Sequence, residues 1–461
     1  MIVLLALVLS SFVIYYQVVI KRSGRLTANS IFVYLHTTMA IGSLVLLNTA
    51  WEADARYAWI IVYTLLAYMI ASGVLTHAQP PSLTKSERSP PLVQTPTLGF
   101  WLWAALSALI VVLYFQAVGY SAFLEGIRAQ FGGPKADVAT LRLNSYAGSR
   151  YLFPGYVNQF KNALLPSLLV IAVTYWVKTG LLKRRRLLLV LWSGLTLFGL
   201  LGTGQRGAFV IFAVAALIFV YLMNNGSLPR GSGAAIISTV CVLLTSTIAL
   251  GRSTGDLGTE ANLGDRIRVA APELSDRILT ANQGSAVVGF RYIYTYTSIQ
   301  HGRDWEESLV GLLPDDTGSD IDNRIFAYRY GSPRGSSPPA IWGSIYYNFG
   351  WAGIALSPIL LAVLLVWVTK RGMSGAKRDS VELMGISGVF AVLGFWVAGA
   401  PLFFLNNGIV IYIALWAIGA RSRRKHERQN GPDSASSTPT GGAIGAHLAK
   451  PSGTHHLTPQ G

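Results

Sequence analysis

Residues 343–368, GSIYYNFGWAGIALSPILLAVLLVWV, form the longest of the apolar runs in this chain and carry no charged side chain. A helix needs roughly 20 apolar residues to cross the ~30 Å of hydrocarbon in a bilayer. The eleven runs of this kind lie at approximately 1–20, 29–50, 57–76, 99–120, 160–178, 187–201, 207–223, 233–250, 343–368, 381–399 and 402–420. The sequence therefore predicts an all-α polytopic membrane protein with about eleven transmembrane helices, the ninth of which Pro358 could kink.

The composition of the whole chain agrees with this class. Its 461 residues are 52% hydrophobic and only 13% charged, and the mean hydropathy is +0.44. A soluble protein of about three domains would not have such a surface. The single cysteine, Cys241, lies inside an apolar run, so an intramolecular disulfide and a metal site built from cysteines are excluded.

The net charge of +16 comes largely from cations at the ends of the apolar runs. This placement follows the positive-inside rule, and no long soluble basic domain exists that would indicate a nucleic-acid partner. The cations that share one side of the membrane are Lys21, Arg22 and Arg25; Lys85 and Arg88; Lys178 and Lys183–Arg186; Arg230; Lys370, Arg371, Lys377 and Arg378; and Arg421–Lys425. We place this side in the cytoplasm.

This orientation predicts two parts of the chain. Residues 1–420 form the transmembrane domain, with the amino terminus outside and two long connections, about 121–158 and 251–340, on the outer face. Residues 421–461 form a basic cytoplasmic tail that lies against anionic lipids. The tail should be disordered, because residues 429–461 are rich in Ser, Thr, Gly, Pro and His and cannot bury a core.

The outer connection from Gly251 to Pro339 is rich in charge. It contains twelve acidic residues and nine cations, and every cation is an arginine. These are Arg252, Arg266, Arg268, Arg277, Arg291, Arg303, Arg324, Arg329 and Arg334. Arginine holds a phosphate or a carboxylate with two parallel hydrogen bonds, so the loop suggests an anionic ligand. The alternative is that GC-rich coding favours arginine and that many of these residues pair with neighbouring acids.

The same connection carries aromatic residues at alternate positions from Phe290 to Tyr296. Tyr292 and Tyr294 could stack on sugar rings, with Arg291 between the aromatic rings. The pattern fits equally well the buried face of a strand or an interfacial aromatic belt, and we prefer that interpretation.

A very short outer connection, Gly202-Thr203-Gly204-Gln205-Arg206-Gly207, separates two predicted spans. The backbone N–H groups that open the next helix form a natural anion site. Arg206 would be unfavourable there by about 0.3–1 kcal/mol unless an anion shared the site. Arg206 therefore either binds an anion or extends its side chain to the membrane interface.

His301 is the one histidine of seven that this topology places on the outer face of the membrane. It precedes Arg303 and Asp304 and is a candidate general base, with Asp304 or Glu306 as second candidates. It could also be an exposed loop residue without a chemical role. The predicted spans contain almost no ionisable side chains, Glu382 lying at a boundary, which disfavours a transporter. No motif for a metal or a nucleotide is present, so we expect neither a metal nor a cofactor.

Four segments together suggest a family: TGQRG at 203–207, SLVGLLP at 308–314, SPPA at 337–340 and YYNFGWAGI at 346–354. With the many predicted spans, they resemble the bacterial oligosaccharide repeat-unit polymerases, also called O-antigen polymerases. The resemblance covers roughly 10–420, and the turn with Arg206 is shared with the related O-antigen ligases.

The resemblance implies a metal-independent membrane glycosyltransferase of the GT-C type in the bacterial cytoplasmic (inner) membrane. Such an enzyme transfers the growing chain from undecaprenyl diphosphate to the next lipid-linked repeat unit on the outer face. A chain-length regulator and a flippase are its possible partners. An O-antigen ligase, or less readily a flippase or transporter of lipid-linked sugars, remains an alternative.

Arginines of the outer loops hold the diphosphate in this family. By position, the resemblance therefore implies catalytic roles for Arg206, Arg291, His301, Arg303 and Asp304. Substrate-binding roles fall to Arg252, Arg324, Arg334, Tyr292 and Tyr294.

Overall fold

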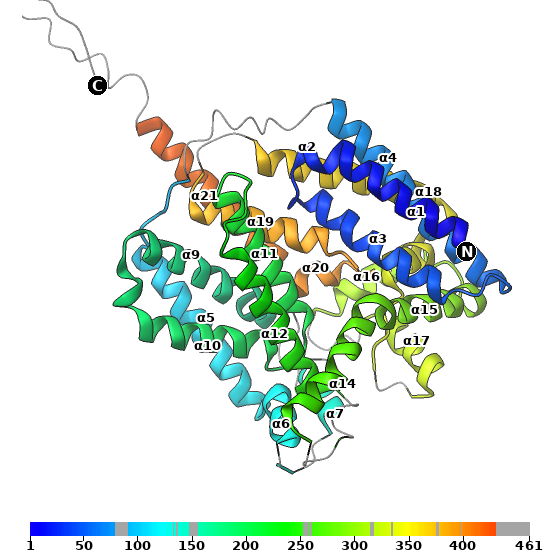
Figure 1. The fold of residues 1–461 in the computed structure, drawn as a ribbon, viewed down its shortest axis with the longest axis horizontal. Helices are drawn as coiled ribbons and strands as arrows, with labels where there is room; N and C mark the ends of the chain where they lie inside the picture. The colour runs from blue at the N-terminus through cyan, green and yellow to red at the C-terminus, as the bar shows by residue number, and fades with distance from the viewer. Residues whose placement is uncertain are drawn as a thin grey trace, which may run out of the picture.

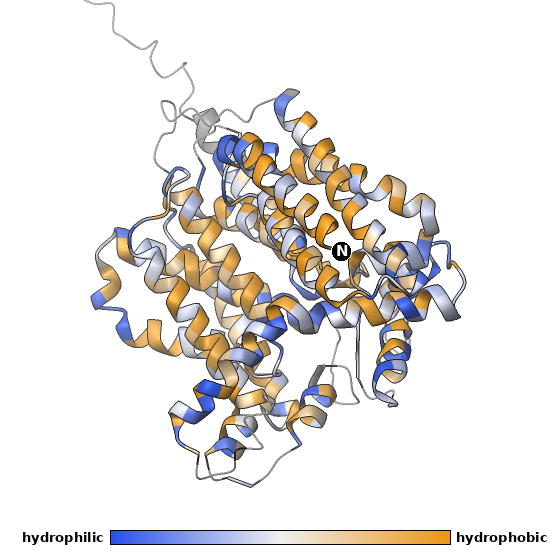
Figure 2. Cartoon of the chain, turned by 45° about the vertical axis from the view of Figure 1, so that its right-hand side comes forward, coloured by the Kyte–Doolittle hydropathy of each residue, from blue (hydrophilic) through white to orange (hydrophobic). Residues whose placement is uncertain are grey.

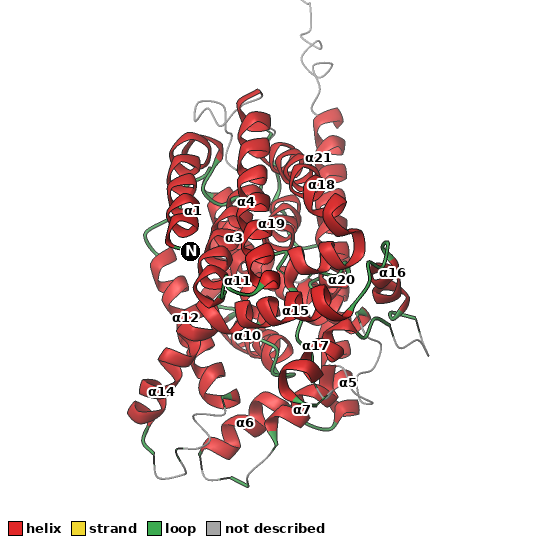
Figure 3. Cartoon of the chain, turned by 90° about the vertical axis from the view of Figure 1, so that its right-hand side faces the viewer, coloured by secondary structure: helices red, strands yellow, loops and turns green. Residues whose placement is uncertain are grey.

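The computed structural model describes residues 1–78, 91–131, 133–134, 137–146, 155–251, 257, 261–313, 318–332, 335–374, 378–397 and 399–429. Within these ranges the chain is helical, and the only β-bridge joins Leu92 to Asp379 (Figure 3). The chain is a multi-pass membrane protein, because several of its helices are long and apolar enough to cross a bilayer.

The first half of the chain contains α1 (Ile2–Tyr15), η1 (Tyr16–Ile20), α2 (Lys21–Ser23), α3 (Ala28–Leu46), α4 (Glu52–Ala78), α5 (Leu98–Val118), α6 (Ala122–Gln130), α7 (Val138–Tyr146), α8 (Tyr156–Asn158), η3 (Gln159–Leu164), α9 (Leu165–Lys178), η4 (Leu181–Lys183), α10 (Arg186–Leu201) and α11 (Gly207–Met223). The second half contains α12 (Ser232–Leu250), α14 (Leu263–Asp276), η5 (Arg277–Ala281), α15 (Asn282–Tyr296), α16 (Arg303–Val310), α17 (Ile321–Tyr330), α18 (Ala340–Met373), α19 (Ser380–Gly394), α20 (Leu402–Asn406) and α21 (Ile409–Gln429).

Seven helical segments among the described residues are long and apolar enough to span a membrane, and three shorter apolar helices, α10, α11 and α19, accompany them. Each of the first ten predicted runs coincides with one of these helices. The eleventh run is divided at Asn407 and Gly408 into α20 and α21. The count of eleven spans therefore stays a prediction. The predicted disorder of the tail is wrong for residues 421–429, which continue α21, and residues 430–461 lie outside the described part.

The apolar helices form two packed groups, with polar residues concentrated toward the ends of the bundle (Figure 2). One hydrophobic core joins α1, α3, α4, α11, α18, α19 and α21, and a second joins α5, α9 and α10. Helices α6, α7 and α14 to α17 lie together at the bundle end that faces away from α2 (Figure 1). We call this the loop end, since it carries the connections 121–158 and 251–340.

The long connection of the loop end is helical rather than irregular. Helices α14, η5 and α15 follow one another without a break from Leu263 to Tyr296. The backbone of η5 lies directly on α3, because a Cβ on Gly42 would be 1.8 Å from the carbonyl oxygen of Leu279. This helix thus runs along the loop end from α12 to α3, α4 and α18.

Helix α18 is broken at Gly350. Gly350 has φ 58° and ψ −148°, a conformation that glycine adopts readily and that other residues avoid. A Cβ at this position would also lie 2.6 Å from Ile299. The break inside α18 lies at Gly350 and not at Pro358, where the sequence suggests a kink; Ala340, the first residue of the helix, also has a positive φ of 57°.

Glycines allow α19 and α21 to pack closely. A Cβ on Gly385 would lie 2.2 Å from the backbone nitrogen of Trp416, and one on Gly388 would lie 1.8 Å from the ring of Tyr412. Small residues are the usual means by which membrane helices approach each other, since van der Waals contact drives their association.

This close approach makes Gly385→Ala destabilising. We expect a loss of about 2 kcal/mol, because backbone atoms of α21 would have to move away from the added methyl group. Gly194→Ala is the matched control: Gly194 is also helical and has no atom within 4 Å of an added Cβ, so stability should be unchanged or slightly higher. Thermal unfolding of both variants in one detergent measures this, and equal unfolding midpoints would contradict the packing.

Candidate functional site

Arg291 is engaged in an ion pair. Its Nε and a terminal nitrogen donate to the two carboxylate oxygens of Asp54, each at 2.6 Å. Asp54 is fully buried and also accepts from the backbone N–H of Asn48 at 2.7 Å, while the guanidinium lies over the ring of Trp51. Arg291 therefore fastens α15 to the start of α4, which is a structural role rather than a free anion site.

Arg303 and Arg324 also pair with neighbouring acids. Arg303 donates to Glu307 at 2.9 Å, and Arg324 donates to Asp320 at 2.6 Å, both four residues away on one helix. All four side chains are exposed, so each pair contributes little to stability. For these arginines the pairing alternative is confirmed. Arg252 and Arg334 lie outside the described residues.

The alternating aromatics belong to helix α15, so the strand interpretation is wrong. In a helix, alternate positions fall on different faces, and residues four apart share a face. Phe290 and Tyr294 accordingly stack at 6.0 Å, and Tyr292 and Tyr296 contact each other at 5.7 Å and both contact Tyr328. The Tyr294 hydroxyl donates to Glu52 at 2.9 Å.

His301 and Asp304 have different surroundings. His301 is exposed in the turn before α16 and has φ 53°. Asp304 is 5% exposed, and its carboxylate accepts from Ser319 and, at 3.2 Å, from Nδ2 of Asn348. Asp304 therefore joins α16 to α18, and its two oxygens are already engaged.

Asp322 is a carboxylate that sequence reasoning did not single out. Burial raises its pKa to about 6, the hydrogen bond from Ser336 opposes the shift, and the charge of Asp304 adds to it. A carboxylate with this pKa is a candidate general base. Only the fold brings Asp304 and Asp322 near each other, because they lie on separate helices.

Arg206 lies where several elements of the loop end meet. It precedes α11, and its guanidinium donates to Oγ1 of Thr247 and to the carbonyl oxygen of Ser246, both at 3.1 Å, in the last turn of α12. A cation is favourable at this end of a helix. Arg206 thus binds the carboxyl end of one helix while it begins another.

Helix α7 brings a second arginine to this turn. Gly204 has φ 78°, and a Cβ there would lie 2.5 Å from Cγ of Arg142, so the Arg142 side chain rests on the turn. The position is fixed by Ser145, whose hydroxyl donates to the carbonyl oxygen of Thr203 at 3.3 Å and whose own carbonyl accepts from Tyr114 at 2.5 Å.

The charge around Arg206 is predominantly positive. Its pKa is lowered to about 9, first by burial and then by the charges of Arg277 and Arg142, with Glu273 opposing the shift. Glu273 also pairs with Arg277 at 3.1 Å, so part of its negative charge is already compensated by that arginine. We call Arg142, Arg206, Arg277 and Glu273 the arginine cluster.

Several buried polar atoms at the arginine cluster have no hydrogen-bond partner among the described residues. These are Nε of Arg206, Oγ1 of Thr203, Oγ of Ser246 and Oε2 of Glu273. Buried polar atoms are normally paired, and each unpaired one is costly. An anion with several oxygens would satisfy the donors and balance the excess charge.

Lys161 is a second residue that sequence reasoning overlooked, although it stands inside the predicted span 160–178. It is 1% exposed, its Nζ donates to Oδ1 of Asn162 at 2.9 Å, and it forms no ion pair within the described residues. It lies in the π-helical segment η3 and packs against Gly199, just before the turn that carries Arg206. The expectation of spans nearly free of ionisable groups is therefore wrong at this position.

The asparagines beside Lys161 in the chain bind the break between α20 and α21. Asn162 donates to the carbonyl oxygen of Asn406 at 3.1 Å, and Asn158 donates to its side-chain oxygen at 3.3 Å. Gly408, with φ 81°, allows α21 to start against Ala163. An ionisable group inside a membrane span usually has a function, and helix breaks often accompany such sites.

No three His, Cys, Asp or Glu side chains come together as possible metal ligands in the part of the chain that the structure describes.

The structural role of Arg291 predicts the behaviour of its variants. Arg291→Ala should destabilise the protein by about 3 kcal/mol, because it leaves the buried Asp54 carboxylate without its cation. The double change Arg291→Met with Asp54→Leu should recover most of this stability. Arg324→Ala, which breaks an exposed pair, should cost under about 1 kcal/mol. Thermal unfolding distinguishes the three, and equal losses in the two single variants would refute the clamp.

The chain matches no protein-family model, and comparisons with curated proteins and with solved structures found no match.

Proposed function

We propose that this protein is a metal-independent membrane glycosyltransferase that polymerises undecaprenyl-diphosphate-linked oligosaccharide repeat units. It would act at the outer face of the bacterial cytoplasmic membrane, with about eleven transmembrane helices and the loop end outside. The observation that carries the proposal is the arginine cluster, in which Arg142 and Arg277 add positive charge around the partly buried Arg206 and Glu273 opposes it. The resemblance of 203–207, 308–314, 337–340 and 346–354 to repeat-unit polymerases supports it.

The chemistry of such a transfer fits this cluster. A hydroxyl of the incoming repeat unit attacks the anomeric carbon of the donor chain, and the bond between that carbon and the diphosphate oxygen breaks. The electron pair goes to the diphosphate, which gains negative charge in the transition state. Guanidinium groups that are already held in a partly buried site stabilise this charge without a metal. Arg206 is their centre because it donates to the end of α12 and the charges of Arg142 and Arg277 both act on it.

The hydroxyl proton needs an acceptor. His301 is our first candidate because its ring is exposed and accessible to a substrate. Asp304 is buried with both oxygens engaged, so a role in orienting α16 fits it better than proton transfer. Asp322, whose pKa is raised by burial, and Glu306 are the other candidate proton acceptors.

A second candidate function, movement of lipid-linked sugars across the membrane, is favoured by Lys161. A buried cation among asparagines at a helix break is typical of sites in transporters. The two functions differ in the side of the membrane on which single repeat units accumulate when the protein is absent.

Deletion of the gene tests the function. If the protein polymerises, the ladder of long glycan chains should disappear, and single lipid-linked repeat units should accumulate on the outer face. The size distribution of lipid-linked and surface glycan measures this. Long chains retained on the lipid carrier would indicate a ligase, and repeat units trapped on the cytoplasmic face would indicate a flippase; either outcome would contradict the proposal.

Arg206→Ala should lower the rate of chain formation by about 10²–10³-fold, because it removes one preorganised donor to the leaving diphosphate. Arg206→Lys should restore only part of the rate, since lysine cannot donate two parallel hydrogen bonds. Arg324→Ala is the matched control and should keep the normal ladder, because Arg324 is exposed and paired with Asp320. The rates are compared at equal protein level, and a normal ladder from Arg206→Ala would refute the site.

A further inference from the structure

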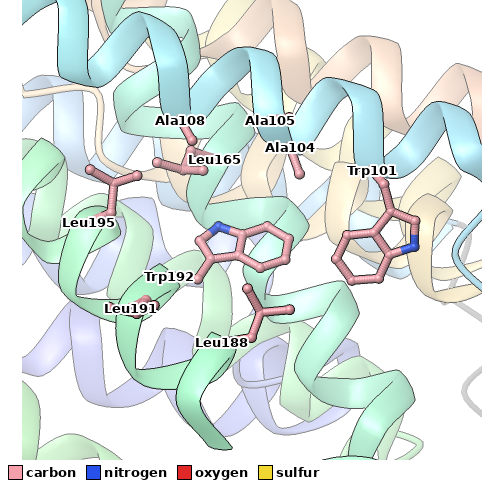
Figure 4. Close-up of a pocket in the computed structure, with 9 residues that line it drawn as sticks. All are labelled: Trp101, Ala104, Ala105, Ala108, Leu165, Leu188, Leu191, Trp192 and Leu195. Atoms are coloured by element: carbon pink, nitrogen blue, oxygen red, sulfur yellow. The ribbon is translucent and has the colours of Figure 1, made fainter. Parts of the chain in front are cut away.

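An apolar pocket of about 300 Å³ opens between α5, α9 and α10, and none of the residues that line it belongs to the arginine cluster. Nine side chains line it: Trp101, Ala104, Ala105, Ala108, Leu165, Leu188, Leu191, Trp192 and Leu195 (Figure 4). The three alanines of α5 leave the space, and the exposed side chains of Leu188 and Leu191 form the side that faces the hydrocarbon. We call it the α5–α10 pocket. Its volume is at the lower end of that of ligand pockets, which suits a single flexible chain.

A basic turn lies at one end of the α5–α10 pocket. Lys178 ends α9, and Lys183, Arg184, Arg185 and Arg186 lead into α10, the helix that forms one wall of the pocket. All five cations are exposed, and none pairs with a carboxylate in the described ranges. Cations grouped at the membrane surface attract anionic lipid head groups, at roughly 1 kcal/mol for each cation.

An aromatic cluster forms part of the pocket wall. Trp192 contacts Trp101 at 5.9 Å, Trp176 at 6.4 Å and Phe100 at 6.4 Å, measured between ring centroids. Tryptophan prefers the level of the membrane where head groups meet acyl chains. The basic turn therefore adjoins a pocket whose wall is aromatic and apolar, as the head group and the acyl chain of a phospholipid require.

Trp192 lies in the wall of the pocket. The residue is only 7% exposed, and its indole lies across the pocket between the alanines of α5 and the leucines of α10 (Figure 4). A helix rises ~1.5 Å per residue, so Trp192 lies roughly 9 Å along α10 from Arg186. A lipid whose phosphate binds the basic turn would have the start of an acyl chain near this depth.

We propose that the α5–α10 pocket, with the basic turn, is a binding site for an anionic phospholipid. One acyl chain fills the pocket and packs against Trp192, and the phosphate lies against Lys183, Arg184 and Arg185. The charge of the turn selects an anionic head group, and the volume of the pocket admits one chain. This inference does not depend on the proposed glycosyltransferase activity.

Native mass spectrometry of the purified full chain tests the site, with dioleoyl phosphatidylglycerol or dioleoyl phosphatidylcholine added. Three changes should each lower bound phosphatidylglycerol by about tenfold: Ala104→Leu with Ala108→Leu, which fills the pocket; Ala105→Leu alone, which fills it in part; and Lys183→Gln with Arg184→Gln and Arg185→Gln. Wild type should bind phosphatidylcholine much more weakly than phosphatidylglycerol.

Two controls match these changes. Ala234→Leu enlarges an exposed alanine of α12, and Arg230→Gln removes an exposed cation at another turn, so both should bind phosphatidylglycerol normally. Thermal unfolding shows which variants remain folded, and Ala105→Leu, the smallest change, serves if the doubly filled pocket does not fold. Equal binding of the two lipids, or normal binding by the folded pocket-filling variants, would overturn the proposal. Loss in the basic-turn variant alone would mean contact with the head group only and would also overturn it.

Discussion

The ion pair between Arg291 and Asp54 holds the loop end in place. It joins the only long helix of the loop end to the start of α4 through a carboxylate that is fully buried. A buried pair of this kind is costly to break, because the remaining charge would have no partner. The part of this helix formed by α14 and the start of η5 places Glu273 and Arg277 near Arg206. The geometry of the arginine cluster therefore depends on a contact that lies outside it.

Compensation of charge distinguishes the arginines of the loop end from one another. Arg291, Arg303 and Arg324 each have a carboxylate at hydrogen-bonding distance, and their positive charge is thereby balanced locally. Around Arg206 positive charge predominates, because the charges of Arg142 and Arg277 lower its pKa and that of Glu273 opposes them. A site for a multiply charged anion requires this kind of surplus, because a carboxylate on every cation would compete with the ligand. The surplus, rather than the number of arginines, is what makes the cluster a candidate site.

Departures from regular helix occur where the bundle brings polar groups together. The break at Gly350 bends α18 next to the segment that leads to Asp304, and the break before α21 sets Asn406 against Asn158, Asn162 and the neighbourhood of Lys161. In a membrane, backbone groups that leave a helix must find other partners inside the protein. The side-chain amides of Gln159 and Asn162 meet this requirement by donating to the carbonyl oxygens of Leu405 and Asn406, and Asn162 also accepts from the buried ammonium group of Lys161.

The sequence by itself determined the class of fold and most helix positions, because long uncharged runs can only be helices in a bilayer and their length is set by its thickness. It also singled out the turn with Arg206 and the arginine-rich connection. It did not determine which arginine is balanced by a carboxylate, because the decisive partner of Arg291 lies 237 residues away. Nor did it show that the alternating aromatics are helical, or that Lys161 and Arg142 lie beside the same turn, since these depend on how the helices pack. Charge pairing between distant elements is a property of the folded chain, and only the tertiary structure decided it.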